Sequence, residues 1–190
     1  NIAVGANALD AASSSNNNIA LGYNSLSSLV TGTDNVAVGQ NSIQDLTTGS
    51  SNVALGAQAL QNNTSGSENT ALGRQAGQNS LGSRNIFIGY QAGRNETGND
   101  KLYIESSSST TPLIYGDFAT DVIDINGDLN VTGDITYVGT ITDVSDRRLK
   151  ENIKSLNDVL PSLMNLTGYS YSLKKDKEKN VEFGFIAQEV

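Results

Sequence analysis

Histidine, cysteine and tryptophan are absent from the 190 residues of the chain. Without histidine, Ser-His catalysis and the commonest metal ligand are both excluded. Without cysteine, the chain can form neither a disulfide nor a cysteine-based metal site, so an extracellular location would not rest on disulfides. We therefore expect no metal and no cofactor.

Positive charge is scarce, and long apolar runs are missing. Residues 1–144 hold 4 basic and 13 acidic residues, whereas residues 145–190 hold 8 basic and 7 acidic residues. The overall net charge of -8 argues against binding to nucleic acid or to an anionic membrane surface, because both partners need a basic face. No apolar run approaches the roughly 20 residues of a transmembrane helix, so we expect no membrane insertion in this segment.

What the chain does contain is a repeat. Six copies of a nine-residue motif, from "NIAVGANAL" to "NIFIGYQAG", begin at Asn1, Asn18, Asn35, Asn52, Asn69 and Asn85. Their spacing is 17 residues four times and then 16, and a degenerate seventh copy, "KLYIES", follows 16 residues later at Lys101. The chain begins inside a repeat and without a methionine, so we interpret it as a fragment of a longer protein.

Each copy alternates with a period of two, which is typical of a β-strand. Bulky residues such as Ile19 and Leu21 share one face, alanines such as Ala20 take the other, and a glycine follows. Two short strands and two turns in 17 residues bury no core alone, so the copies must stack about 4.8 Å apart. This predicts a mainly β fold, a parallel β-solenoid with coils of about 17 residues, in which the asparagine and glutamine columns form hydrogen-bonded ladders.

The "NxAxG" core of "NIAVG" and "NVALG" resembles the YadA-like head repeat of trimeric autotransporter adhesins. The resemblance implies a β-roll, three copies of which pack side by side as a homotrimer. The alanine column then predicts the contact between chains, because methyl groups allow close approach. For the polar columns we favour a structural role over ligand binding: the GGxGxD repeat of calcium-binding rolls is missing, and the threonines are too irregular for an ice-binding face.

Two further segments follow the predicted head at residues 1–100. Residues 101–144 keep β-branched alternation without the repeat and predict a β-rich stalk of hairpins or interwound strands. Residues 145–190 change to helical spacing, with Leu156, Val159, Leu160 and Leu163 on one face, and then predict a hairpin around the charged loop "KKDKEKN". This predicts a small α+β segment after the stalk.

The motifs "SDRRLKENI", "LTGYSYSL" and "GFIAQEV" resemble, in order, the intramolecular chaperone domain of endosialidase-type phage tail spikes and fibres. The resemblance implies a domain that trimerises, guides folding of the preceding fibre and is released by a cut between Val144 and Ser145. Residues 145–190 would be its N-terminal part, with Ser145 as nucleophile and Lys150 as base.

The proposed chemistry also has an argument of its own. Because the chain lacks histidine, a lysine is the available base for a serine hydroxyl, and neighbouring arginines would lower the pKa of Lys150. From spacing alone the alternative is that Ser145 caps a helix and Lys150 is a solvated residue on it. At most this would be a single-turnover, self-cleaving peptidase.

These observations predict a trimeric fibre or adhesin projecting from a virion or cell surface, and hence an extracellular location. Its partners would be its own copies and a host-surface receptor or glycan. Two alternatives remain: a polysaccharide-degrading tail spike carrying the same chaperone, and an uncleaved, purely structural surface filament. The acidic residues of the first 144 positions are scattered in turns rather than paired, which does not support the degrading enzyme.

Overall fold

A computed structural model describes residues 1–136, 138, 167–171 and 182–184. The chain divides into two compact units, Asn1–Asp134 and Ile135–Val190, and each is described by itself. Ser145, Lys150, the predicted helix at 156–163 and the loop "KKDKEKN" lie outside the described residues.

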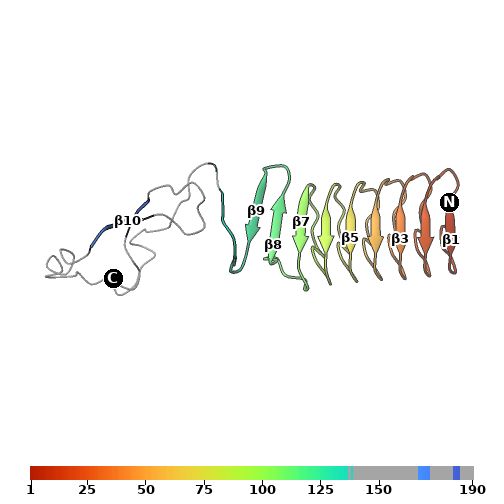
Figure 1. Cartoon of the computed structure of the whole chain (residues 1–190). Helices are drawn as coiled ribbons and strands as arrows, with labels where there is room; N and C mark the ends of the chain where they lie inside the picture. Colours follow the sequence, from red (N-terminus) through yellow and green to blue (C-terminus); the bar gives the residue numbers. More distant parts are fainter. Residues whose placement is uncertain (137, 139–166, 172–181, 185–190) are drawn as a thin grey trace. The chain divides into compact units, whose positions relative to one another are not determined.

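The first unit is a parallel β-solenoid, as the repeat predicted (Figure 1). Its strands stack in sequence order: β1 (Ile2–Val4), β2 (Ile19–Leu21), β3 (Val36–Val38), β4 (Val53–Leu55), β5 (Thr70–Leu72), β6 (Ile86–Ile88) and β7 (Lys101–Ile104). Each residue pairs with its counterpart one repeat later, for example Ala20 with Ala37. The degenerate seventh copy keeps this register, because Phe87 pairs with Tyr103. The period of the sequence is therefore the period of the stack.

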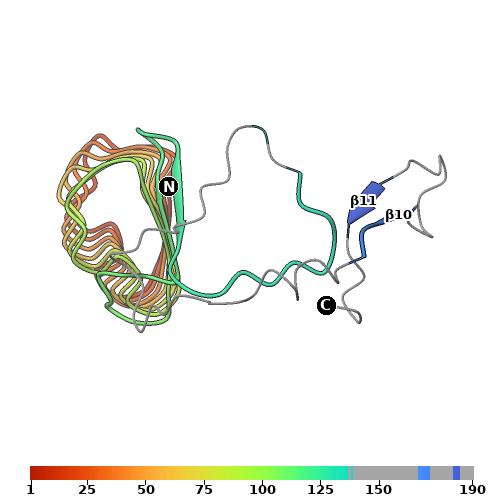
Figure 2. The ribbon, with the colours of Figure 1, turned by 90° about the vertical axis from the view of Figure 1, so that its left-hand side faces the viewer.

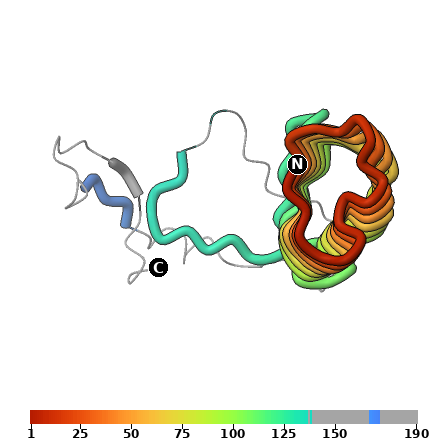
Figure 3. Tube along the Cα trace, turned by 90° about the vertical axis from the view of Figure 1, so that its right-hand side faces the viewer, coloured from red at the N-terminus to blue at the C-terminus, as the bar shows by residue number. Residues whose placement is uncertain are grey.

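Each coil within residues 1–100, all of which are described, contains one three-residue strand rather than the two that we predicted. Viewed along the solenoid axis, the strands superpose on one side and turns close the rest of the coil (Figures 2 and 3). These turns use left-handed backbone at non-glycine residues, including Leu26 (φ 50°) and Ile43 (φ 46°). Such residues cost about 1–2 kcal/mol each. Both side chains are fully buried, so the apolar core offsets this strain.

The alanine column faces the inside of the solenoid, which corrects our prediction that it forms the contact between chains. Ala20, Ala37 and Ala54 are fully buried within one chain. The opposite wall of the coil supplies large side chains to the same core, among them Leu26 and Leu29. The interior is narrow, so a strand that faces such leucines has room only for methyl groups. The bulky strand residues consequently point outward.

Large and small side chains exchange places near the C-terminal end of this core. Phe87 replaces alanine in the strand column and is fully buried. Glycines 77 and 93 occupy the column that earlier coils fill with Leu26, Ile43 and Leu60. A Cβ atom at either glycine would overlap the Phe87 ring. The lost leucine volume is thus taken by the phenylalanine, which keeps the core filled.

One asparagine per coil forms a buried ladder along the axis, as the amide columns predicted. In the fourth coil, Asn52 Nδ2 donates to Asn35 Oδ1 at 3.0 Å and to the carbonyl oxygen of Gly66 at 2.9 Å. Its Oδ1 accepts from the backbone nitrogen of Asn69 at 3.1 Å and from Asn69 Nδ2 at 3.0 Å. The side chain is therefore satisfied at both ends although it is fully buried.

The solenoid sheet ends in an antiparallel meander. Strand β8 (Ile114–Asp117) pairs antiparallel with β7, and β9 (Val122–Ile125) pairs antiparallel with β8. Lys101 Nζ lies 2.6 Å from Asp117 Oδ2 across the first pair. This hydrogen bond lowers the pKa of the Asp117 carboxyl group. Hairpin strands therefore follow the last coil, which is one of the two arrangements predicted for this segment.

In the second unit, β10 (Tyr169–Tyr171) pairs antiparallel with β11 (Glu182–Gly184), and Tyr169 lies opposite Gly184. This confirms the strand pair predicted on the two sides of the charged loop. No helix is present among the residues that the structure describes, and so none that could cross a membrane.

Candidate functional site

The strands present a continuous apolar surface to solvent. We call the outward-pointing residues of β1–β7 the apolar face: Ile2, Val4, Ile19, Leu21, Val36, Val38, Val53, Leu55, Thr70, Leu72, Ile86, Ile88, Leu102 and Ile104. Leu21 is 43% exposed, Leu55 39% and Leu72 47%. None of the fourteen residues is charged. Single exposed apolar residues are common on monomers, but a surface seven strands long without a charge is typical of an interaction site.

The apolar face extends beyond the last coil. A shallow cavity of about 310 Å³ is lined by Ile88, Ile104 and Leu113, together with Gly89, Glu105 and Ser106. Leu113 itself is 54% exposed. The next strands of the meander are also apolar on their exposed side, including Ile123 at 58%. The exposed apolar surface therefore runs from β1 into the meander.

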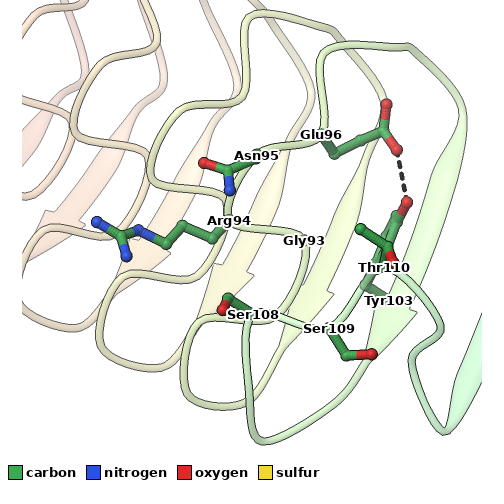
Figure 4. Close-up of a pocket in the computed structure, with 8 residues that line it drawn as sticks. All are labelled: Gly93, Arg94, Asn95, Glu96, Tyr103, Ser108, Ser109 and Thr110. Carbon is green, nitrogen blue, oxygen red and sulfur yellow. Dashed lines mark hydrogen bonds between the residues drawn. The ribbon is translucent and has the colours of Figure 1, made fainter.

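A separate polar cleft opens at the end of the last coil (Figure 4). It measures about 190 Å³ and is lined by Gly93, Arg94, Asn95, Glu96, Tyr103, Ser108, Ser109 and Thr110. The turn 93–96 closes the last coil, Tyr103 comes from β7, and residues 108–110 belong to the loop between β7 and β8. These residues become neighbours because β7 stacks on β6, which places the loop after β7 beside the turn of the preceding coil.

Tyr103 and Glu96 form the rigid part of this polar cleft. The hydroxyl of Tyr103 donates to Glu96 Oε2 at 2.6 Å, and Glu96 Oε1 accepts from the backbone nitrogen of Gly98 at 2.6 Å. Burial, reinforced by the hydrogen bond to Glu96, raises the pKa of the Tyr103 hydroxyl well above its ordinary value. The hydroxyl therefore stays protonated and acts as a donor at neutral pH.

Aromatic packing holds the Tyr103 ring in place. Its centroid lies 6.0 Å from that of Phe87 and 5.3 Å from that of Tyr115, the second pair being edge to face. Such pairs contribute about 0.5–1.5 kcal/mol each beyond their buried area. The side chain thus has little freedom to leave the cleft.

Sequence reasoning singled out Ser145 and Lys150, which lie outside the described residues, and missed both the outward direction of the apolar face and the polar cleft. The alternation of the strands carries the first signal, because it defines two faces. No spacing pattern connects Glu96, Tyr103 and the serines of the 105–112 loop. Among the described residues, no group of three or more carboxylates, histidines or cysteines is placed to hold a metal ion.

Comparison with known families gave a match at the C-terminal end of the chain. A family model described as the chaperone of endosialidase matches residues 145–190, about a quarter of the chain. The match begins at the serine where the charge balance changes. Comparison with curated proteins and comparison with solved structures gave no match.

Proposed function

We propose that this chain is part of a homotrimeric fibre or adhesin exposed on a virion or cell surface, which binds a host-surface receptor or glycan. Residues 1–100 form its head and 101–144 its stalk. Residues 145–190 are the N-terminal part of an intramolecular chaperone that assists trimer folding. The observation that carries the proposal is the apolar face, and the family match at 145–190 and the likeness of the repeats to YadA-like heads support it.

The apolar face provides enough free energy for association. Burying a large aliphatic side chain completely contributes about 1.5–3 kcal/mol, so a half-exposed one contributes about 1 kcal/mol. Seven of the fourteen positions are aliphatic side chains that are 36–57% exposed, and together they give about 7 kcal/mol, which is comparable to the 4–15 kcal/mol that association costs in lost freedom. In a trimer the apolar faces of all three chains are buried, and the meander adds its own apolar surface. We therefore expect a net gain in free energy on association.

The trimer is tested by sedimentation equilibrium of the chain and of Leu55→Glu. Leu55 is exposed in the single chain, so glutamate there leaves the coil intact but would bury a charge between chains. We expect trimer for the unaltered chain and monomer for Leu55→Glu. The matched control Ser65→Glu, in an exposed turn of the same coil, should stay trimeric. A trimeric Leu55→Glu variant would contradict the proposed interface.

We further propose that the chaperone is released by self-cleavage between Val144 and Ser145. The Ser145 hydroxyl attacks the carbonyl carbon of Val144, Lys150 accepts the hydroxyl proton, and the amide C–N bond breaks as the amine leaves with that proton. Water then hydrolyses the ester. The lysine is required in its neutral form, which arginine cannot provide.

The cut is tested by expressing the full-length protein and sequencing the N-termini of its fragments. We expect a fragment that begins at Ser145, and a single uncut chain for Ser145→Ala, Lys150→Ala and Lys150→Arg. Ser155→Ala serves as the matched control and should be cut normally. An intact chain in the unaltered protein would refute self-cleavage and favour the uncleaved structural filament, while the trimer proposal would stand.

A further inference from the structure

We propose that the polar cleft at the end of the last coil binds one neutral sugar residue of a surface glycan. The inference rests on the proposed function, since it names the class of ligand that the fibre would recognise and where. It is carried by the chemistry of the lining residues, by the size of the cleft and by two amide ladders that end in it.

The lining of the polar cleft combines both kinds of hydrogen-bonding group with an aromatic side chain. Glu96 is an acceptor, the hydroxyls of Ser108 and Thr110 donate and accept, and Asn95 adds an amide. Among the hydrogen bonds of the described residues, none uses Asn95 Nδ2, Ser108 Oγ or Thr110 Oγ1. These groups are therefore available to a ligand, and Figure 4 shows them around one opening with Tyr103.

This combination favours a ligand rich in hydroxyl groups. Each sugar hydroxyl is both a donor and an acceptor, so it matches a carboxylate, an amide and a hydroxyl equally well. Arg94, the cation of the lining, extends away from Tyr103 and Glu96 and donates to Gln78 (Figure 4). Glu96 would therefore repel a phosphate or carboxylate ligand, and an apolar ligand would leave the polar lining without partners. A neutral polyol meets neither penalty.

The size of the polar cleft limits the ligand to about one sugar ring. Its volume of about 190 Å³ lies below the roughly 300–1,000 Å³ of pockets for drug-sized ligands. Tyr103 is already held by Phe87 and Tyr115, and Glu96 by the Gly98 nitrogen. Because these contacting groups need no ordering on binding, even a small ligand loses little affinity to entropy.

Two side-chain ladders lead along the solenoid axis to this opening, one partly buried and one at the surface. In the first, Gln78 Nε2 donates to Gln61 at 2.9 Å, and Arg94 Nε donates to Gln78 Oε1 at 2.8 Å. In the second, Asn62 donates to Asn79, and Asn79 donates to Asn95 Oδ1, both at 2.7 Å.

Arg94 and Asn95 are the last members of these ladders and also line the polar cleft. A side-chain amide has two N–H groups, so the partly exposed Asn62 and Asn79 each keep one for a ligand, whereas Gln78 is buried. The neighbouring residues of a glycan therefore find donors and acceptors about 4.8 Å apart along the axis.

The test is saturation-transfer NMR on the whole chain with D-glucose, D-galactose, N-acetyl-D-glucosamine and linear oligomers of each. For a ligand of this size we expect a dissociation constant of about 1 mM, with tighter binding of the oligomers. Ser108→Trp should fill the cleft and abolish the signal. Tyr103→Phe should weaken binding about fivefold by removing one hydrogen-bonding hydroxyl. Tyr90→Phe makes the same chemical change at an exposed tyrosine outside the cleft and should bind normally.

Thermal melting of each variant establishes that it is folded before binding is compared. Absence of saturation transfer from every sugar, or equal binding by folded Ser108→Trp, would overturn the proposal. Sedimentation of the same samples separates this outcome from failure of the proposed function. A trimer that binds no sugar refutes the glycan site alone, whereas a monomer that binds sugar refutes the trimer alone.

Discussion

Removal of one side-chain amide from the buried asparagine ladder should destabilise the solenoid far more than the small size of the amide group suggests. In Asn52→Ala, the backbone N–H of Asn69 loses the Oδ1 atom that accepts its hydrogen bond, and the carbonyl oxygen of Gly66 loses its Nδ2 donor. Asn35 Oδ1 keeps the Asn52 backbone nitrogen as a partner, and Asn69 Nδ2 keeps the Gly82 carbonyl. Two buried backbone groups are left unpaired, at about 1–3 kcal/mol each, so the expected loss is about 4 kcal/mol.

This loss is large against the 5–15 kcal/mol by which domains are usually stable. Urea unfolding followed by circular dichroism measures it: with a slope of about 2 kcal/mol per M, the midpoint should fall by about 2 M. The matched control is Asn62→Ala in the same coil, which removes an amide of a partly exposed ladder and should lower stability by at most about 1 kcal/mol. Equal midpoints for the two variants would refute the argument that burial makes the ladder indispensable.

Two further pairs of substitutions test the core. Ser80→Ala should stabilise the fold by about 1 kcal/mol, because its buried hydroxyl has no partner, whereas Ser25→Ala should destabilise it by a similar amount, because Ser25 Oγ donates to a buried carbonyl. Melting temperatures that shift in the same direction in both variants would contradict this prediction. Phe87→Ala should cost about 3–5 kcal/mol, and adding Gly93→Leu should recover part of it by restoring the alanine–leucine pairing of earlier coils. Urea midpoints of the two single variants and the double variant measure the coupling, and strictly additive losses would show that the two positions do not share one space.

The solenoid could be predicted because the sequence is periodic. When the same residue recurs every 16 or 17 positions, parallel stacking must place the copies above one another, so register and ladders follow without knowledge of the coil shape. The pairing of Ala20 with Ala37 and the contact of Asn52 with Asn35 are direct consequences. The hairpin strands β10 and β11 were predictable for a similar reason, since alternation and a charged loop are both local signals.

The direction of the alanine column was not predictable from alternation. A period of two separates the residues of a strand into two faces. Alternation does not tell which face is buried until the residues of the opposite wall are known. Here Leu26 and Leu29 arrive from turns, one of them with left-handed backbone, and fill the space in front of Ala20. Methyl groups therefore point inward and isoleucine and leucine outward, the opposite of the expectation that small residues mark the contact between chains.

The sequence by itself determined the repeat, the stacking register, the ladders and the seam of charge at Ser145, because each depends on residues that are identical or adjacent along the chain. The tertiary structure alone decided what faces solvent and what gathers in the polar cleft. Glu96 and Tyr103 meet the 108–110 loop only because β7 stacks on β6, which places the loop beside the last turn. Likewise, Phe87 fits only because Gly77 and Gly93 leave room for its ring, a complementarity of volumes that exists in space and not along the sequence.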